Sequence, residues 1–124
     1  MRVLVCGGRD FHDKEFLFRT LDRFHNQYHF EVVIQGEAKG ADLLAKEWAE
    51  SRLVSCWCFP ADWAKHGKRA GYLRNIEMLE KGQPDLVIAF PGGRGTDHMK
   101  SIARKAGVSV IEFINGQSTI DAFF

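Results

Sequence analysis

Three glycine-rich stretches of the sequence carry the residues best suited to holding an anion. They read Gly7-Gly8-Arg9-Asp10, Gly36-Glu37-Ala38-Lys39-Gly40-Ala41-Asp42 and Pro91-Gly92-Gly93-Arg94-Gly95-Thr96. Glycine lets a turn bring its backbone N–H groups close to a ligand, and a following helix N-terminus adds unpaired N–H donors and partial positive charge. Arg9 and Arg94 can each pair with phosphate oxygens or a carboxylate through two hydrogen bonds. One such turn alone can serve chain geometry only, but three together predict a phosphate site.

The candidate ligand-binding residues combine these turns with polar side chains after the third expected strand. They are Gly7, Gly8, Arg9, Gly36, Gly40, Asp62, Arg74, Asn75, Pro91, Gly92, Gly93, Arg94, Gly95 and Thr96. Asn75 lies inside an apolar helical stripe and needs a hydrogen-bond partner, either the backbone of a glycine-rich turn or the ligand itself. Trp63 either stacks on a base or covers the edge of the sheet. Lys68 and Arg69 either form a solvated turn or approach a phosphate.

Two carboxylates are the candidate acid–base groups. Asp10 and Glu37 each come after glycine beyond the end of an expected strand, where a carboxylate can reach a ligand at the sheet edge. Asp42 and Asp97 fall at expected helix N-termini, where a carboxylate more often caps the helix than takes part in chemistry. We therefore expect Asp10 and Glu37 to be the catalytic residues of any reaction.

Neither the histidines nor the cysteines predict a metal site. His25 and His29 have the i, i+4 spacing of a helical metal pair, but no third ligand lies nearby in the sequence. Cys56 and Cys58 lie on one face of a strand and are expected to be buried structural thiols. Three cysteines without a C-x-x-C pair fit a reducing cytoplasm. We expect no cofactor besides a nucleotide-derived ligand.

The elements that must position these residues alternate between strands and helices. Apolar runs of strand length cover Arg2–Cys6 and residues 31–35, 54–59, 85–90 and 109–113. Helical stripes between them contain Leu17, Leu21, Phe24 and Tyr28; Ala41, Leu44, Ala45, Trp48 and Ala49; Tyr72, Ile76 and Leu79; and Met99, Ile102, Ala103 and Ala106. Asp13 is the expected N-cap of the first helix. This order predicts an α/β, Rossmann-like, doubly wound domain with a mainly parallel five-stranded sheet and helices on both faces.

Length and charge limit the remaining possibilities. The chain has 124 residues, which suits one domain over residues 1–124. Its formal net charge is +1, so an anion site must be local, and general attraction to nucleic acid or to an anionic membrane is not expected. No apolar run has the length of a membrane span, and the N-terminus is interpreted as a strand rather than a signal peptide. A cytoplasmic protein is predicted, and a homo-oligomer is consistent with so short a domain.

Two common nucleotide motifs are missing from the sequence. It has no G-x-x-x-x-G-K-[ST], so a Walker-type triphosphate hydrolase is excluded. The first glycine-rich turn does not follow G-x-G-x-x-G, which argues against an ordinary NAD-dependent dehydrogenase. The predicted phosphate loop is therefore of another type.

The third glycine-rich stretch resembles the P-G-G-x-G-T loop of the SLOG superfamily, which includes the LOG phosphoribohydrolases and DNA-processing protein A. Within that superfamily the chain is most similar to the YspA-type branch. The matching positions are Gly7-Gly8-Arg9-Asp10-Phe11, Gly36-Glu37-Ala38-Lys39-Gly40-Ala41-Asp42, Pro60-Ala61-Asp62-Trp63, Gly67, Ala70-Gly71, Arg74-Asn75 and Met78. The resemblance spans almost the whole chain. It implies a Rossmann-like fold that binds nucleotides or nucleotide-derived ligands.

One position departs from the LOG pattern. The LOG enzymes continue their loop as P-G-G-x-G-T-x-x-E, and the glutamate takes part in cleaving the bond between base and ribose. Met99 occupies that position here and can neither accept a proton nor stabilise a cation. The phosphoribohydrolase activity is therefore not transferred to this chain.

Three functions remain open on the sequence alone. The first is an enzyme that hydrolyses an N-glycosidic or phosphate-linked bond of a nucleotide-derived molecule. The second is a sensor or sequestering protein that binds such a ligand without turnover, which Met99 favours. The third, suggested by the DNA-processing relatives, is single-stranded nucleic-acid binding, against which the near-neutral charge argues.

Overall fold

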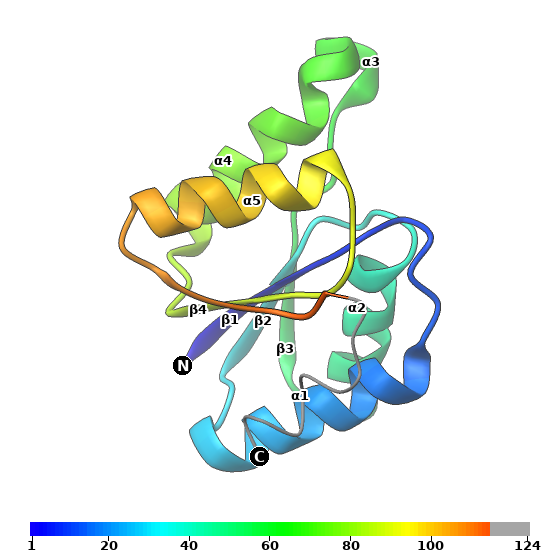
Figure 1. The fold of residues 1–124 in the computed structure, drawn as a ribbon, viewed down its shortest axis with the longest axis vertical. Coiled ribbons are helices and arrows are strands. Elements are labelled where there is room, and N and C mark those ends of the chain that lie inside the picture. The colour runs from blue at the N-terminus through cyan, green and yellow to red at the C-terminus, as the bar shows by residue number, and fades with distance from the viewer. Residues whose placement is uncertain (115–124) are drawn as a thin grey trace.

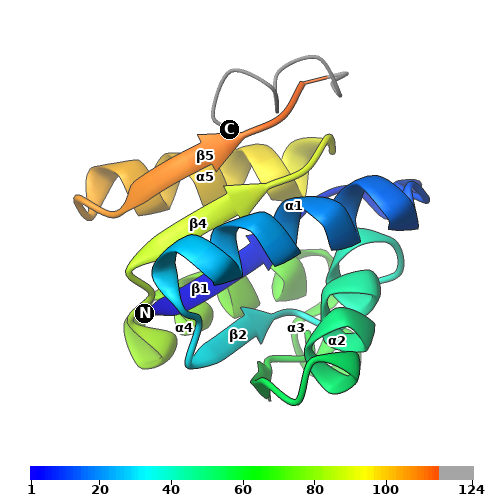
Figure 2. The ribbon, with the colours of Figure 1, turned by 90° about the horizontal axis from the view of Figure 1, so that it is seen from below.

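The alternating strands and helices form the α/β arrangement that the sequence predicts. The computed structural model describes residues 1–114, and the last part of the domain expected over residues 1–124 lies outside the described residues. The strands are β1 (Arg2–Cys6), β2 (Val32–Gln35), β3 (Ser55–Cys58), β4 (Leu86–Ala89) and β5 (Ser109–Glu112), and they join in one sheet. All strand pairs are parallel, in the order β3-β2-β1-β4-β5 (Figures 1 and 2).

This strand order decides where a ligand can bind. The chain builds outward from β1 to β2 and β3, then crosses back to place β4 on the other side of β1. Because the sheet is parallel, all carboxyl ends of the strands lie at one edge. The order reverses between β1 and β4, and in open sheets of this kind ligands bind at that reversal.

Helices cover both faces of the sheet. Helices α1 (Lys14–Tyr28) and α2 (Ala41–Ser51) lie on one face, and α4 (Ala70–Gly82) and α5 (Arg94–Lys105) lie on the other (Figure 2). The short α3 (Trp63–His66) and the 3-10 turn η1 (Gly67–Arg69) project beyond the sheet at the start of α4 (Figure 1). The first helix begins at Asp13 as predicted, since the Asp13 carboxylate accepts a hydrogen bond from Phe16 N at 3.0 Å.

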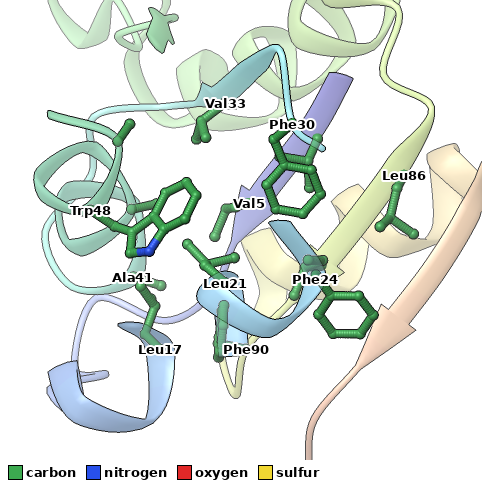
Figure 3. Packing of buried hydrophobic residues seen from close by; sticks show 14 of the residues in the cluster. Val5, Leu17, Leu21, Phe24, Phe30, Val33, Ala41, Trp48, Leu86 and Phe90 are labelled. Carbon is green, nitrogen blue, oxygen red and sulfur yellow. The ribbon is translucent and has the colours of Figure 1, made fainter. Parts of the chain in front are cut away.

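Two apolar layers hold the helices on the sheet. Successive strand residues point to opposite faces, so Val5 faces α1 and α2 while Leu4 faces α4 and α5. The first layer is built around the fully buried Trp48 and includes Leu21 (Figure 3). The second includes the fully buried Met99. The residue that replaces the LOG glutamate is thus part of the core.

The buried face of α4 differs from the expected stripe. Of the expected stripe, Leu79 packs against the core, whereas Tyr72 and Ile76 are 41% and 37% exposed. The helix is buried mainly through Asn75, Met78 and Gly82. A Cβ atom on Gly82 would lie 3.0 Å from Ile34 Cδ1, so a small residue is needed where α4 crosses β2. Apolar residues occur on two sides of α4. The side that packs on the sheet is the one that carries Gly82, not the side that was predicted.

The edge strand β3 is also less covered than expected. The expected strands extend beyond β2, β3, β4 and β5 by one or two residues. Cys56 is half-buried and Cys58 is exposed, so the expectation of two buried thiols was wrong for Cys58. Both thiols lie on one face as expected, because Gln35 Nε2 donates to Cys58 Sγ at 2.9 Å and also contacts Cys56 Sγ. Over residues 1–114, no helix has the length and apolarity needed to cross a membrane.

Candidate functional site

The turn after β1 and the turn after β4 meet at the point where the strand order reverses. Gly8 N donates a hydrogen bond to Pro91 O at 2.8 Å, and Ala41 N, at the start of α2, donates to Gly8 O at 3.3 Å. A Cβ atom on Gly40 would overlap Gly8 O, and the φ angle of Gly40 is +84°, so glycine is required there. The predicted convergence of the glycine-rich turns is therefore present, with direct contacts between them.

A cavity of about 650 Å³ opens beside this junction, a size typical of small-molecule sites. The predicted residues that line it are Gly7, Gly8, Arg9, Asp10, Arg74, Asn75, Pro91, Gly92, Gly93, Arg94, Gly95 and Thr96. Trp63 and Lys68, for which a ligand contact was one of two alternatives, also line it. The remaining lining residues were not predicted for the site and are Cys6, Phe11, Ala38, Asp42, Gly71, Tyr72 and Met78.

Four of the predicted site residues do not line the cavity. Gly36 and Gly40 instead contact residues that line it. Gly36 O accepts a hydrogen bond from Arg74 Nη1 at 2.5 Å, and Gly40 packs on Gly8. Asp62 caps α3 and accepts from Lys65 N at 3.1 Å. Glu37 forms an ion pair with Lys46, whose Nζ lies 2.9 Å from Glu37 Oε1.

The ion pair leaves Glu37 poorly placed for catalysis. Its hydrogen bond with Lys46 lowers the pKa of the Glu37 carboxyl, so the group stays ionised and directed at Lys46. Of the two candidate acid–base groups, the structure brings only Asp10 to the cavity.

Several backbone amides of the second glycine-rich stretch are bonded within the protein. Gly36 N and Ala38 N donate to Asp42 Oδ2 at 3.2 and 3.3 Å, and Glu37 N donates to Gln35 Oε1 at 2.6 Å. Gly8 N is bonded to Pro91 O, as described above. These amides are not available to a ligand. The site therefore offers fewer free N–H donors than three equivalent glycine-rich turns would provide.

The first turn of α5 keeps its amides open. Among the described residues, the N–H groups of Arg94, Gly95 and Thr96 have no hydrogen-bond acceptor, as expected for a helix N-terminus without a side-chain cap. A Cβ atom on Gly93 or Gly95 would meet no atom within 4 Å. Packing does not require glycine at these two positions, and the space above them is open. This turn is the best-formed anion-binding element of the cavity.

Basic side chains from four segments surround the cavity. They are Arg9 after β1, Lys68 in η1, Arg74 in α4 and Arg94 in α5. Arg74 is the most enclosed, and burial lowers the pKa of its guanidinium. Asp10 and Asp42 are the acidic residues of the lining. The cavity therefore has an excess of positive charge although the whole chain is nearly neutral.

Asn75 holds the first turn of α5 in place. It is 4% exposed; its Nδ2 donates to Gly95 O at 3.1 Å and lies 3.2 Å from His98 Nδ1. Its Oδ1 accepts from Arg74 Nε at 3.1 Å. Of the two partners expected for Asn75, the backbone of a glycine-rich turn is thus present, at Gly95. Burial lowers the pKa of His98, so a neutral ring can accept from Asn75.

Two exposed aromatic rings border the cavity. Trp63 is 47% exposed and Tyr72 is 41% exposed. The Arg9 guanidinium lies over the Trp63 ring, with Cζ 5.1 Å from the centroid, and Tyr72 contacts the edge of His98 at 4.7 Å between centroids. Trp63 thus borders the cavity with about half of its surface exposed and with Arg9 over its ring.

Asp42 is the acidic residue of the cavity wall that was not among the predicted site residues. It was expected to cap α2, but the N-cap is Gly40, and the Asp42 side chain instead holds the turn at residues 36–38. Burial raises the pKa of its carboxyl to about 6, against the lowering effect of Arg74. A signal was present: Asp42 precedes the buried Ala45 and Ala49 by three and seven positions, so it shares their face of the helix.

Metal-ligating side chains do not gather at the cavity. Within residues 1–114, no group of three or more His, Cys, Asp or Glu residues could hold a metal ion. His25 Nδ1, one of the two helical histidines, accepts a hydrogen bond from Phe30 N at 2.9 Å.

Comparison with known proteins agrees with this architecture. Residues 1–66 match the profile of the YspA, cpYpsA-related SLOG family (YAcAr). The matched part contains β1, β2 and the first two glycine-rich stretches. Over 120 residues the chain is 43% identical to the Gene 61 protein of Mycobacterium phage D29, and the alignment covers 90% of this chain and 95% of that protein. The chain therefore belongs to the YspA, cpYpsA-related SLOG family.

Proposed function

We propose that the cavity binds a nucleotide or a nucleotide-derived small molecule, with a phosphate group at the first turn of α5. The observation that carries this proposal is the set of unbonded amides at Arg94, Gly95 and Thr96, three residues that line the cavity beside two glycines that packing does not require. Phosphate oxygens are suited to such donors. Arg94 and Arg9 add charge from the exposed rim.

The aromatic side of the cavity supports a base or another planar group. Trp63 and Tyr72 come from different elements and both expose part of their rings. An aromatic base gains about 1–3 kcal/mol by stacking on such a ring. A cavity with a phosphate site and exposed aromatic rings fits a nucleotide better than an inorganic anion, which needs no apolar contact.

Hydrolysis of an N-glycosidic or phosphate-linked bond is the catalytic form of this proposal. Asp10 is the predicted acid–base residue that lines the cavity, whereas Glu37 is paired with Lys46. The buried Met99 offers no carboxylate at the LOG position. This last observation favours the second candidate function, a non-catalytic sensor or sequestering protein with the same pocket.

Substitutions in the first turn of α5 test the binding proposal. We expect Arg94→Ala and Gly93→Val each to weaken binding of a nucleoside monophosphate by about tenfold or more, because they remove a charged partner or fill the open space. Arg104→Ala, at the other end of α5 and paired with Glu112 on the surface, is the matched control. Isothermal titration calorimetry gives the affinities, and circular dichroism checks the fold. Wild-type affinity in both folded variants would show that this turn is only a connection.

Product analysis distinguishes the enzyme from the sensor. The protein is incubated with a panel of nucleoside mono-, di- and triphosphates, and the mixture is analysed by mass spectrometry. Release of a free base or of phosphate that disappears in Asp10→Asn supports hydrolysis. Tight binding with every ligand recovered intact supports the sensor.

A further inference from the structure

The carboxyl group of Asp42 lies in the wall of the cavity, where the proposed function gives it no role. Asp42 is in the first turn of α2 and is 6% exposed. It lines the cavity together with Gly7 and Gly8, the residues at the end of β1. A buried acid beside an anion site is unusual, because burial and a nearby anion both oppose its negative charge.

The hydrogen bonds that hold this carboxylate use only one of its two oxygens. Both hydrogen bonds to the group, from Gly36 N and Ala38 N, end on Oδ2. The other oxygen, Oδ1, accepts neither of these bonds, and Asp42 belongs to the lining of the cavity. The group can therefore exchange a proton through the cavity without breaking the turn at residues 36–38.

The charged and titratable neighbours of Asp42 come from three other segments. Arg74 of α4 and Arg9 of the turn after β1 both favour the ionised carboxylate, with Arg74 the stronger. The Cys6 thiol at the end of β1 is neutral, because burial raises its pKa. Burial outweighs the two arginines and raises the pKa of Asp42 to about 6. The carboxylate is thus ionised at neutral pH but needs little extra negative potential to take up a proton.

We propose that Asp42 takes up a proton when a phosphate-bearing ligand enters the cavity. The inference rests on the proposed function, because it needs an anion at the first turn of α5. An arriving anion adds negative potential in a partly enclosed space and competes for Arg9 and Arg74, the two cations that stabilise the Asp42 charge. Protonated Asp42 would offer a donor at Oδ1 to the ligand. Ligand affinity would then increase as the pH falls toward 6.

Calorimetry with inorganic sulfate tests this proton uptake. Sulfate keeps both negative charges across the pH range used, so any proton taken up binds to the protein. Titrations near pH 6.5 in two buffers of different ionisation enthalpy give the number of protons. We expect uptake of roughly half a proton or more per sulfate bound by the wild type, and loss of this uptake in Asp42→Asn. The Asn carbonyl can accept both amide bonds, since they converge on one oxygen.

Asp97→Asn is the matched control. Asp97 lies in the first turn of α5, its side chain is 69% exposed, and it does not line the cavity. Its substitution should leave the proton uptake at the wild-type value. Equal uptake in wild type and Asp42→Asn, with sulfate still bound, would overturn the inference and leave the proposed function standing. Failure of the wild type to bind both sulfate and nucleoside phosphates would overturn both.

A measurement on the wild type covers the case in which Asp42→Asn does not fold. The carboxyl carbon of Asp42 is followed by ¹³C NMR through a pH titration with and without sulfate. We expect the midpoint to move to higher pH when sulfate is present. An unchanged midpoint at saturating sulfate would overturn the inference.

Discussion

The glycines around the cavity serve two different purposes. At Gly92, a Cβ atom would overlap Thr96 Oγ1 and lie 2.7 Å from Gly8 N, so the two turns touch there. At Gly95, a Cβ atom would meet nothing within 4 Å. Sequence alone shows the same residue type at both positions. Contact with neighbouring backbone explains the first, and the open space beside the amides of α5 is the reason to associate the second with a ligand.

This contrast predicts opposite effects of one substitution. Gly92→Ala should lower the free energy of unfolding by about 1–3 kcal/mol, because the new methyl group forces the turns apart. Gly95→Ala should raise it by a few tenths to about 1 kcal/mol, because alanine is the better helix former. We also expect Gly95→Ala to weaken nucleotide binding. Urea denaturation followed by fluorescence measures the two stabilities. A destabilised Gly95→Ala would mean that this glycine has a structural task.

Asp42 makes the stability of the fold depend on pH in a defined direction. Its pKa is about 6 in the folded protein and 3.8 ordinarily, so the folded state holds the proton more tightly. The stabilisation from this group is complete below about pH 4 and is lost as the pH rises to about 6, with a total of roughly 3 kcal/mol. Asparagine has no such dependence.

The difference between wild type and Asp42→Asn isolates this effect from other titrating groups. We expect the wild type to lose stability relative to Asp42→Asn between pH 4 and pH 7, as measured by urea denaturation at a series of pH values. A constant difference across this range would mean that the Asp42 carboxyl has the same pKa in the folded and unfolded states, and would contradict this prediction.

Helices α3 and α4 show how far the elements could be predicted. The strands, the cap at Asp13 and the two-sided covering of the sheet followed from residue spacing, because these features depend on local sequence and apolar burial. The face of α4 did not, because Tyr72 and Met78 are both apolar and only the contact between Gly82 and Ile34 decides which side packs. The ion pair of Glu37 was not predicted either, because its partner Lys46 lies nine positions later in α2, and only the path of the intervening turn brings the two side chains together.

Helix α3 provides a further test at this scale. It buries no side chain, so its residues can be changed at little expense to the fold. Trp63→Leu should weaken binding of a nucleoside monophosphate by about tenfold and weaken sulfate binding much less, because a nucleotide loses the stacking of its base whereas sulfate is affected only through the contact between Arg9 and the ring. Trp57→Leu is the matched control: Trp57 is 38% exposed, lies on β3 and is absent from the cavity lining. Equal loss for both ligands, or for both variants, would contradict a stacking role.

At the scale of the whole molecule, the site is built from both the N-terminal and the C-terminal half of the chain, which meet in one sheet. The turn after β1 and the start of α2 come from the half matched by the family profile, whereas the open amides of α5 lie outside it. Parallel strands bring these distant segments to one edge, which is why the sequence predicted their convergence. It could not predict which amides stay open, because that depends on the bonds of Gly8, Gly36 and Ala38. The cytoplasmic location and the homo-oligomer stay predictions.

Charge distribution decides between a small ligand and a nucleic-acid strand. The chain has 17 Lys and Arg residues and 16 Asp and Glu residues, and its positive excess is concentrated in the cavity. A protein that follows a single strand contacts many phosphates and loses affinity steeply with salt, with a slope near −0.7 for each phosphate contacted. One phosphate at α5 predicts a slope of about −1 or shallower for a mononucleotide and no gain for an oligonucleotide. Fluorescence anisotropy with a labelled mononucleotide and a labelled single-stranded 20-mer, from about 50 to 200 mM salt, measures both slopes. A slope of about −4 or steeper, together with tighter binding of the 20-mer, would favour binding of single-stranded nucleic acid. An extended basic groove would then have to exist beside the cavity.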